Sequence, residues 1–171
     1  MAGRPTRTVT LPASQGRTRC RVLIIEGRFY QPISDELAKG AIAELEAAGA
    51  TYERIAVPGA LEIPQVLAQA VAAGLIPASA PSSRYAGAIA LGCVIRGETS
   101  HYDVVCNNAN HWLMDVSVRG HVPIGNGILT VDTEEQAMKR ARGGRDGKGG
   151  DAARACLRLV EIGRQLQGQG A

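Results

Sequence analysis

The sequence predicts an α/β fold in which a four-stranded parallel sheet is covered by helices on both faces, a three-layer α/β/α sandwich. Two observations predict this class. Short runs of Val, Ile, Leu and Ala alternate along the chain with longer segments whose apolar residues recur at helical spacing. The short runs lack the polar alternation of half-exposed strands. Continuous apolar strands separated by helices are typical of parallel sheets with both faces covered.

The first strand and helix are predicted from residues 21–49. Arg21-Val-Leu-Ile-Ile25 is an apolar run rich in branched residues, and it ends at Glu26-Gly27. Ser34-Asp-Glu36 supply polar residues that favour a helix N-terminus. Apolar side chains then keep helical spacing as far as Gly49, a residue type that often follows a helix.

A second strand and helix follow. The strand, Arg54-Ile-Ala-Val57, stops at Pro58-Gly59. Pro64 suits the first turn of a helix that ends at Gly74, because proline is tolerated where the backbone N–H has no helical partner. The next stretch, up to Arg84, is rich in Pro, Ser and Ala and indicates a surface loop.

Tyr85-Ala-Gly-Ala-Ile-Ala-Leu91 predicts a third buried strand, and a third helix runs from about Tyr102 to Gly120. One face of that helix is apolar. Its members are Val105, Ala109, Trp112, Leu113 and Val116.

The last strand and two helices complete the alternation. His121–Val131 predicts a strand whose start, at Pro123, is irregular, as at a sheet edge or a bulge. Thr133-Glu-Glu-Gln136 has the form of a capping box that opens a helix. A basic, glycine-rich loop is predicted over Arg142–Gly150, before a final helix that continues to Gln165. The apolar stripe of that helix is Ala152, Ala155, Cys156, Leu159, Val160 and Gly163.

Composition narrows the function classes. The chain of 171 residues suits one domain, which we predict over residues 20–167, preceded by a flexible N-terminal arm, residues 1–19. A net charge of +3 is too small to indicate nucleic-acid binding. No apolar run reaches the roughly 20 residues that span a bilayer. The N-terminus has no apolar segment of the secretory type, so we expect a cytoplasmic protein.

Metal sites are not predicted. The three histidines and four cysteines are spaced without a metal-ligand pattern, and the cysteines include no C-x-x-C pair. Four strands make a small sheet for this length. We therefore expect the chain to bury surface against neighbouring subunits.

Ligands of open parallel sheets bind beyond the carboxyl ends of the strands, so the segments that follow each predicted strand are the candidates for a site. Gly97-Glu-Thr-Ser-His101 joins a strand to a helix N-terminus, where free N–H groups and the helix dipole favour an anion. His101 would then stand beside that anion, and imidazole suits proton transfer near neutral pH. The alternative is that Thr99 or Ser100 only caps the helix and His101 is a surface residue.

Other candidates also have two interpretations on residue type alone. Glu62 is a carboxylate in an apolar turn between two prolines, and it either accepts hydrogen bonds from a ligand or caps the next helix. Phe29 follows the first strand and either stacks on a flat heterocycle or packs in the ordinary way. A basic cluster either captures phosphate or is a solvated face. Its members are Lys139, Arg140, Arg142, Arg145 and Lys148.

Taken together, these segments resemble the lumazine synthase family in order and spacing, over roughly Arg21–Ile162. The segment from Val94 to His101, Val-Ile-Arg-Gly-Glu-Thr-Ser-His, is the most specific. The others are Gly27-Arg-Phe29, Pro58-Gly-Ala-Leu-Glu-Ile-Pro64, Gly127-Ile-Leu-Thr130, Glu135-Gln-Ala-Met-Lys-Arg140 and Gly147-Lys-Gly149.

The resemblance implies a flavodoxin-like sandwich and active sites between the subunits of a pentamer or a multiple of pentamers. His101 would be the proton carrier and Phe29 would stack on the pyrimidine. Further contacts to the pyrimidine and its ribityl chain would come from Ala60, Leu61, Glu62, Cys93, Val94, Ile95 and Asn126. The phosphate would be bound by Glu98 and Thr99 with Lys148, and by Arg140 of an adjacent subunit.

The implied reaction condenses 5-amino-6-(D-ribitylamino)uracil with 3,4-dihydroxy-2-butanone 4-phosphate to 6,7-dimethyl-8-ribityllumazine. It needs no metal and no cofactor, only the two small-molecule substrates, and riboflavin synthase is a candidate partner. Three residues depart from the family pattern: Tyr30 where Asn is common, Leu61 where Phe is common, and Asn126 where Phe is frequent. They leave open two alternatives, a non-catalytic binder of flavin or lumazine and a structural oligomer of the same fold.

Overall fold

Four strands pair in parallel in the computed structural model, which describes residues 19–168. Their order across the sheet is β2-β1-β3-β4. The strands are β1 (Arg21–Gly27), β2 (Thr51–Val57), β3 (Gly87–Ile95) and β4 (Ile124–Val131). The helices are α1 (Gln31–Ala47), α2 (Ile63–Ala72), α3 (His101–Gly120), α4 (Glu134–Ala141) and α5 (Lys148–Leu166), with short 3₁₀ turns η1 (Ala60–Glu62) and η2 (Gly144–Asp146). The predicted arm, residues 1–19, lies outside the described residues except at Arg19, and the domain limits 20–167 stay a prediction.

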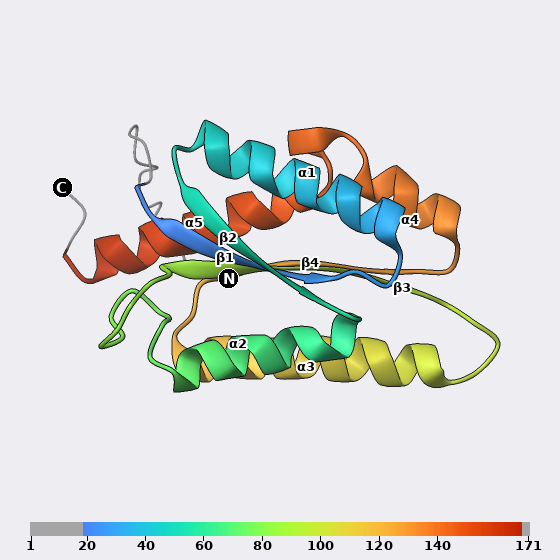
Figure 1. Ribbon diagram of the computed structural model, residues 1–171, viewed down its shortest axis with the longest axis horizontal. Helices are drawn as coiled ribbons and strands as arrows, with labels where there is room; N and C mark the ends of the chain where they lie inside the picture. Colours follow the sequence, from blue (N-terminus) through green and yellow to red (C-terminus); the bar gives the residue numbers. More distant parts are fainter. Residues whose placement is uncertain (1–18, 169–171) are drawn as a thin grey trace, which may run out of the picture.

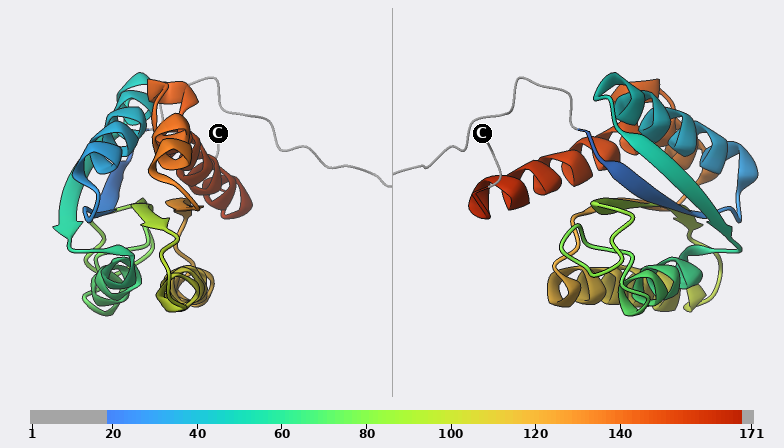
Figure 2. Two further views of the ribbon diagram at one scale, coloured as in Figure 1. Left: turned by 90° about the vertical axis from the view of Figure 1, so that its right-hand side faces the viewer. Right: turned by 60° about the vertical axis from the view of Figure 1, so that its left-hand side comes forward.

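Helices cover both faces of the sheet, so the predicted three-layer α/β/α fold is confirmed. Helices α1, α4 and α5 lie on one face, and α2 and α3 lie on the other (Figure 1). The left view of Figure 2 shows the three layers end on. The amphipathic helices and the doubly covered apolar strands thus bury their apolar surfaces against each other.

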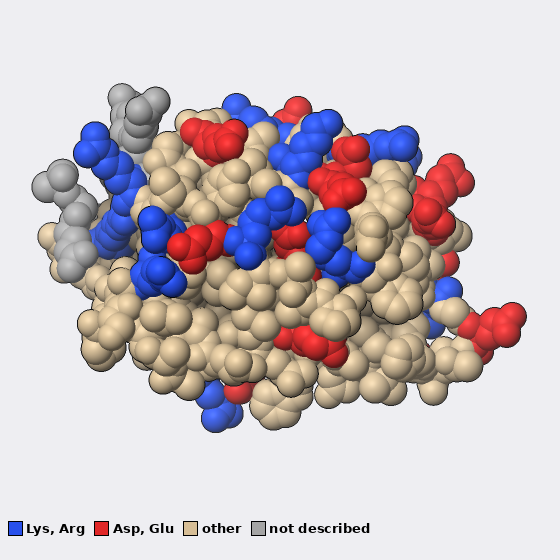
Figure 3. Space-filling model, in the orientation of Figure 1, with Lys and Arg blue, Asp and Glu red and all other residues tan. Residues whose placement is uncertain are grey.

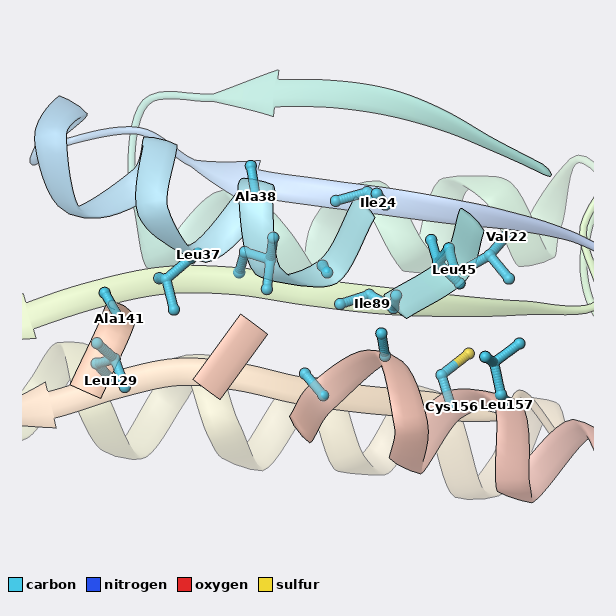
Figure 4. Packing of buried hydrophobic residues seen from close by; sticks show 14 of the residues in the cluster. Val22, Ile24, Leu37, Ala38, Leu45, Ile89, Leu129, Ala141, Cys156 and Leu157 are labelled. Atoms are coloured by element: carbon cyan, nitrogen blue, oxygen red, sulfur yellow. The ribbon is translucent and has the colours of Figure 1, made fainter. Parts of the chain in front are cut away.

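Side chains of β1 alternate between two cores. Val22 and Ile24 pack with the α1 and α5 layer, whereas Leu23 and Ile25 pack with α2 and α3, and all four are fully buried. Figure 4 shows the first core, in which strand residues meet Leu37 of α1 and Cys156 of α5. Burying both faces explains why the strand sequences show apolar runs without polar alternation.

Several boundaries differ from the sequence prediction, among them the starts of β2, at Thr51 rather than Arg54, and of β3, at Gly87 rather than Tyr85. Helix α1 begins at Gln31 with proline in its first turn, so Ser34 lies inside the helix, where its hydroxyl donates to the Tyr30 carbonyl (3.0 Å). Strand β3 continues to Ile95, because its pairing with β4 extends that far. Helix α5 begins at Lys148, so the end of the predicted basic loop is the first turn of the helix.

The buried stripe of α5 is also rotated from the predicted one. Ala153 and Leu157 are buried, whereas Ala155 and Leu159 are exposed in the single chain. At β4 the register with β3 is continuous from Ile124 to Val131. The irregular start at Pro123 is therefore explained by the edge position of the strand rather than by a bulge.

Among residues 19–168, no helix is both long enough and apolar enough to cross a bilayer.

Candidate active site

A cavity of about 330 Å³ opens at the carboxyl ends of the strands. Strand β2 lies on one side of β1 and the next strand, β3, lies on the other side, so the strand order reverses at β1. Ligands of open α/β sheets bind at such a switch point, and the cavity lies there. Its volume is at the lower end of the range typical of small-molecule sites. Four segments line it: Phe29-Tyr30 after β1, Pro58–Glu62 after β2, Cys93–Ile95 of β3, and five residues around the start of α3, which are Gly97, Thr99, His101, Tyr102 and Val105.

The first two segments meet through a close backbone approach. A Cβ atom on Gly27, the last residue of β1, would lie 2.9 Å from the carbonyl carbon and oxygen of Gly59. Only glycine fits there without moving one of the loops. The approach brings the η1 turn, with Ala60, Leu61 and Glu62, to the cavity next to Phe29.

A buried carboxylate fixes the end of β1. Glu26 is 2% exposed and accepts hydrogen bonds from Arg54 of β2 (Nε to Oε1, 2.5 Å; Nη2 to Oε2, 3.0 Å). It also accepts one from Arg28 (3.0 Å), which pairs in addition with Asp35 of α1 (2.5 Å). A buried charge with this many partners is compensated, so Arg28, the residue that precedes Phe29, is held between β1 and α1.

Phe29 is the single phenylalanine of the chain, and its side chain is 73% exposed. Its ring meets the ring of Tyr30 edge on, with centroids 4.9 Å apart and planes at 71°. Ordinary core packing would have buried the ring. An exposed aromatic face at the mouth of a cavity is instead suited to stacking on a flat ligand.

The Glu62 side chain makes no cap hydrogen bond to α2, so it does not cap that helix and instead bonds within its own turn. Its Oε2 accepts a hydrogen bond from the Gly59 N–H (2.9 Å), which stabilises the turn. The same residue lines the cavity. A carboxylate has acceptor capacity beyond one N–H, so Glu62 can hold the turn and accept from a ligand hydroxyl at once.

Cys93, Val94 and Ile95 form the cavity wall on β3. Burial raises the pKa of the Cys93 thiol to about 11, and the nearby Cys106 and Glu134 act in the same direction. The pKa of the Tyr30 phenol is also raised, mainly by burial. At pH 7–8 the Cys93 side chain is therefore a neutral thiol, which is a weak nucleophile.

We expect the Cys93→Ser variant to keep a kcat close to that of the unchanged chain, because a protonated thiol contributes packing rather than a nucleophile. Steady-state turnover measured at pH 7.5 tests this. A loss of activity that matched loss of folded protein would be structural, so the far-UV circular dichroism of both proteins is the control. Loss of turnover in a folded Cys93→Ser variant would contradict the assignment of Cys93 to packing.

The predicted anion loop, Gly97–His101, connects β3 to α3. Thr99 and His101 line the cavity, and the Thr99 Oγ1 accepts a hydrogen bond from the His101 N–H (3.3 Å). The N-cap of α3 is Ser100, which makes no side-chain cap hydrogen bond, so the bond from Thr99 reaches the first residue of the helix instead. His101 is exposed, and it borders the same cavity as Phe29 and Glu62.

Four predicted site residues do not line the cavity of the single chain. Glu98 is exposed on the loop. Asn126 of β4 donates to Asn110 of α3 (2.7 Å) and accepts from the Ile128 N–H (3.0 Å). Arg140 of α4 donates to the Gln136 carbonyl (3.0 Å), and Lys148 pairs with an aspartate of its own helix α5. Both basic residues lie in the layer on the other face of the sheet from α3 (Figure 1).

The structure adds cavity residues to which the sequence assigned no role in the site. Tyr102 and Val105 lie on the first turns of α3, and Tyr30, noted above as a departure from the family pattern, meets the Phe29 ring edge on. Helical spacing from His101 could have indicated Val105, since the two are four residues apart. Within residues 19–168, no group of three or more His, Cys, Asp or Glu side chains is placed to hold a metal ion.

A family model for 6,7-dimethyl-8-ribityllumazine synthase matches residues 19–164, which include every element described above except the last residues of α5. The chain belongs to this family. The resemblance noted in the sequence is therefore confirmed, and so is the fold that it implies.

Curated relatives named 6,7-dimethyl-8-ribityllumazine synthase agree. A protein of Rhodopseudomonas palustris, named 6,7-dimethyl-8-ribityllumazine synthase 1, is 54% identical over 85% of this chain and 87% of its own length. One of Azorhizobium caulinodans is 50% identical over 94% of this chain and 96% of its own length. One of Methylorubrum populi is 54% identical over 84% of this chain and 83% of its own length.

Proposed function

We propose that this lumazine synthase family member condenses 5-amino-6-(D-ribitylamino)uracil with 3,4-dihydroxy-2-butanone 4-phosphate to give 6,7-dimethyl-8-ribityllumazine, a step of riboflavin biosynthesis. One observation carries the proposal. Phe29, Glu62 and His101 come from three segments that are far apart in the sequence, and they line one cavity at the switch point of the sheet. The enzyme would be cytoplasmic.

The pyrimidine would occupy the part of the cavity between Phe29 and β3. The Phe29 ring offers a face for stacking, and the backbone at Cys93, Val94 and Ile95 offers groups for the polar edge of the pyrimidine. The ribityl chain would run along Ala60 and Leu61 toward the Glu62 carboxylate. Leu61 replaces an aromatic that is common in the family, so Phe29 carries more of the stacking here.

The phosphate of the second substrate would lie at the start of α3. Free N–H groups and the positive end of the helix dipole favour an anion there, and Glu98 and Thr99 would contribute backbone N–H groups. Arg140 and Lys148 do not reach the cavity of their own chain, so we assign them to the site of an adjacent subunit. Asn126 would likewise approach a neighbouring site from β4.

The chemistry requires proton transfer and positioning. The pyrimidine 5-amino group attacks the ketone of the sugar phosphate, and water leaves to give an imine. Phosphate is then eliminated, and the ribitylamino nitrogen closes the ring on the remaining carbonyl with loss of water. His101 would carry protons to and from these groups. Holding both reactants in one cavity contributes about 7–11 kcal/mol to such bimolecular reactions.

Assembly into pentamers, or multiples of pentamers, would place the active sites between subunits. The surface of α3 supports self-association, since Val104, Trp112, Met114 and Val118 are large apolar residues and each is 45–67% exposed. Charged side chains gather over the α1 layer, whereas the surface over α2, which lies in front of α3 in the same view, is mostly uncharged (Figure 3). A second copy of this chain would cover the apolar surface of α3.

The Arg140→Ala variant tests the contribution of the adjacent subunit. We expect it to raise the KM for the sugar phosphate by about tenfold, the effect of losing one charge-assisted hydrogen bond, with a smaller change in the KM for the pyrimidine. Lys139→Ala is the matched control, because Lys139 is the preceding exposed cation on α4. A KM for the sugar phosphate that is unchanged in Arg140→Ala would rule out its phosphate role.

The decisive experiment for the function is turnover by the purified protein with both substrates, followed by the absorbance and fluorescence of the lumazine. Product formation supports the proposal. Tight riboflavin binding without turnover would identify a binding protein instead, and oligomers with neither property would identify a structural assembly. Light scattering gives the subunit number, and co-purification with riboflavin synthase tests that partner.

A further inference from the structure

Arg96 makes an unusual set of contacts at the point where β3 ends. Its backbone N–H donates to the Val131 carbonyl (2.9 Å), and its Nε donates to Asp132 Oδ1 (3.1 Å) just beyond the end of β4. Its guanidinium carbon lies 4.1 Å from the centre of the Tyr102 ring, and its Nη1 lies 3.7 Å from Asp103 Oδ1. One side chain thus connects two strand ends with the first turn of α3.

The loop bridged by these contacts has little else to hold it. Residues 97–101 are all exposed, and a Cβ atom on Gly97 would meet nothing within 4 Å. Within residues 19–168, the one hydrogen bond made by a side chain of this loop is that from the His101 N–H to Thr99 Oγ1. Arg96 lies immediately before the loop, and Tyr102 and Asp103 lie immediately after it, so the guanidinium joins the two ends of the loop.

We propose that Arg96 is a positioning residue, which clamps the Gly97–His101 loop in its anion-binding shape by bridging Asp132 and the Tyr102-Asp103 turn. This proposal rests on the proposed function, which assigns the loop to the phosphate group of the sugar substrate. Arg96 acts through the loop, because its side chain faces Asp103, Asp132 and the Tyr102 ring and it is not part of the cavity lining. Preorganised N–H groups bind an anion better than mobile ones, since no ordering accompanies binding.

A simpler electrostatic role makes the opposite prediction for one variant. Arg96 also neutralises the carboxylates of Asp103 and Asp132 near the anion loop. If neutralisation were its whole effect, removing the Asp132 carboxylate would leave more positive charge near the phosphate and tighten binding. If Arg96 is a clamp, removing Asp132 frees the guanidinium from β4 and weakens binding.

The experiment therefore compares Asp132→Ala, Arg96→Gln and Arg96→Lys, with Glu53→Ala as a matched control. Glu53 forms similarly exposed ion pairs with Arg21 (3.3 Å) and Arg84 (3.8 Å) and accepts a hydrogen bond from the Tyr85 hydroxyl, near the amino ends of the strands and far from the cavity end of the sheet. The readouts are KM for each substrate, kcat, and the inhibition constant of inorganic phosphate against the sugar phosphate. Amide hydrogen exchange of residues 97–103 is measured in the same proteins.

We expect Asp132→Ala and Arg96→Gln to raise the KM for the sugar phosphate and the phosphate inhibition constant by about two- to fivefold, the range of one partly exposed ion pair. The KM for the pyrimidine should not change, and exchange at residues 97–103 should be faster. For Arg96→Lys, both constants should lie between those of Arg96→Gln and those of the unchanged chain, because lysine keeps the charge but not the planar fork and the ring contact. Glu53→Ala should match the unchanged chain.

Tighter phosphate inhibition in Asp132→Ala, or exchange at residues 97–103 equal to that of the unchanged chain, would overturn the clamp. Equal increases in both KM values would also overturn it, because they indicate general damage to the site. Failure of the proposed function is distinguishable, since it would show as absence of turnover in the unchanged chain. The exchange rates of the variants would then still decide whether Arg96 holds the loop.

Discussion

Replacing His101 with alanine should lower kcat by about 10²–10⁴-fold, the usual contribution of one general acid–base group. Several steps of the condensation move a proton, and His101 is the one histidine among the residues that line the described cavity. Positioning by the rest of the cavity would remain, so residual turnover and nearly unchanged KM values are expected. Single-wavelength absorbance of the lumazine measures this directly.

His121→Asn is the matched control for that variant. His121 lies just past the other end of α3 and adopts a positive φ of 54°, a conformation that asparagine accepts readily. The control should keep full turnover and show that losing an imidazole just past the other end of α3 has no effect. A His101→Ala variant with unchanged kcat would mean that solvent or another group carries the protons.

Replacing Gly149 with alanine should cause a large loss of stability, about 3 kcal/mol or more, because overpacking of this severity exceeds ordinary core strain. A Cβ atom on Gly149 would lie 1.9 Å from the Leu37 carbonyl oxygen, so α5 would have to move away from α1. That movement would open the core shown in Figure 4, to which Leu37 of α1 and Cys156 of α5 both belong. Urea unfolding at a fixed protein concentration measures the loss, since association also contributes to stability.

Gly163→Ala in the same helix provides the control. A Cβ atom there would meet nothing within 4 Å, so alanine should stabilise α5 by about 0.5–1 kcal/mol through its higher helix propensity. Opposite signs at two glycines of one helix would show that the contact with α1, rather than the helix itself, requires Gly149. A stable Gly149→Ala protein would mean that the two helices can separate without cost.

The class of fold and most of the site were predictable because they depend on local patterns. Apolar runs specify strands buried on both faces, and helical periodicity specifies their covering layers. The motifs from Pro58 to Pro64 and from Val94 to His101 indicated the family, which the comparisons confirm. Since the carboxyl ends of parallel strands share one edge, the sequence alone also placed Phe29, Glu62 and His101 at the same end of the sheet.

Other features depend on contacts between residues distant in the sequence. The stripe of α5 differs from the periodic prediction because Ala153 and Leu157, not Ala155 and Leu159, face the core. Helical spacing defines an apolar stripe but not which part of it a neighbouring layer covers. The hydrogen bond between Asn126 of β4 and Asn110 of α3 was not predictable either, because it joins residues that no local pattern relates.

By itself, the sequence determined the alternation of strands and helices and the family, and it predicted which residues take part in the chemistry. Only the tertiary structure decided the strand order that creates the cavity, the contact of Gly27 with Gly59, and the bridge from Arg96 to Asp132. The physical reason is the sequence separation over which each kind of interaction acts. Propensity and periodicity act over a few neighbouring residues, whereas strand order and ion pairs between distant segments are selected by the packing of the whole sheet.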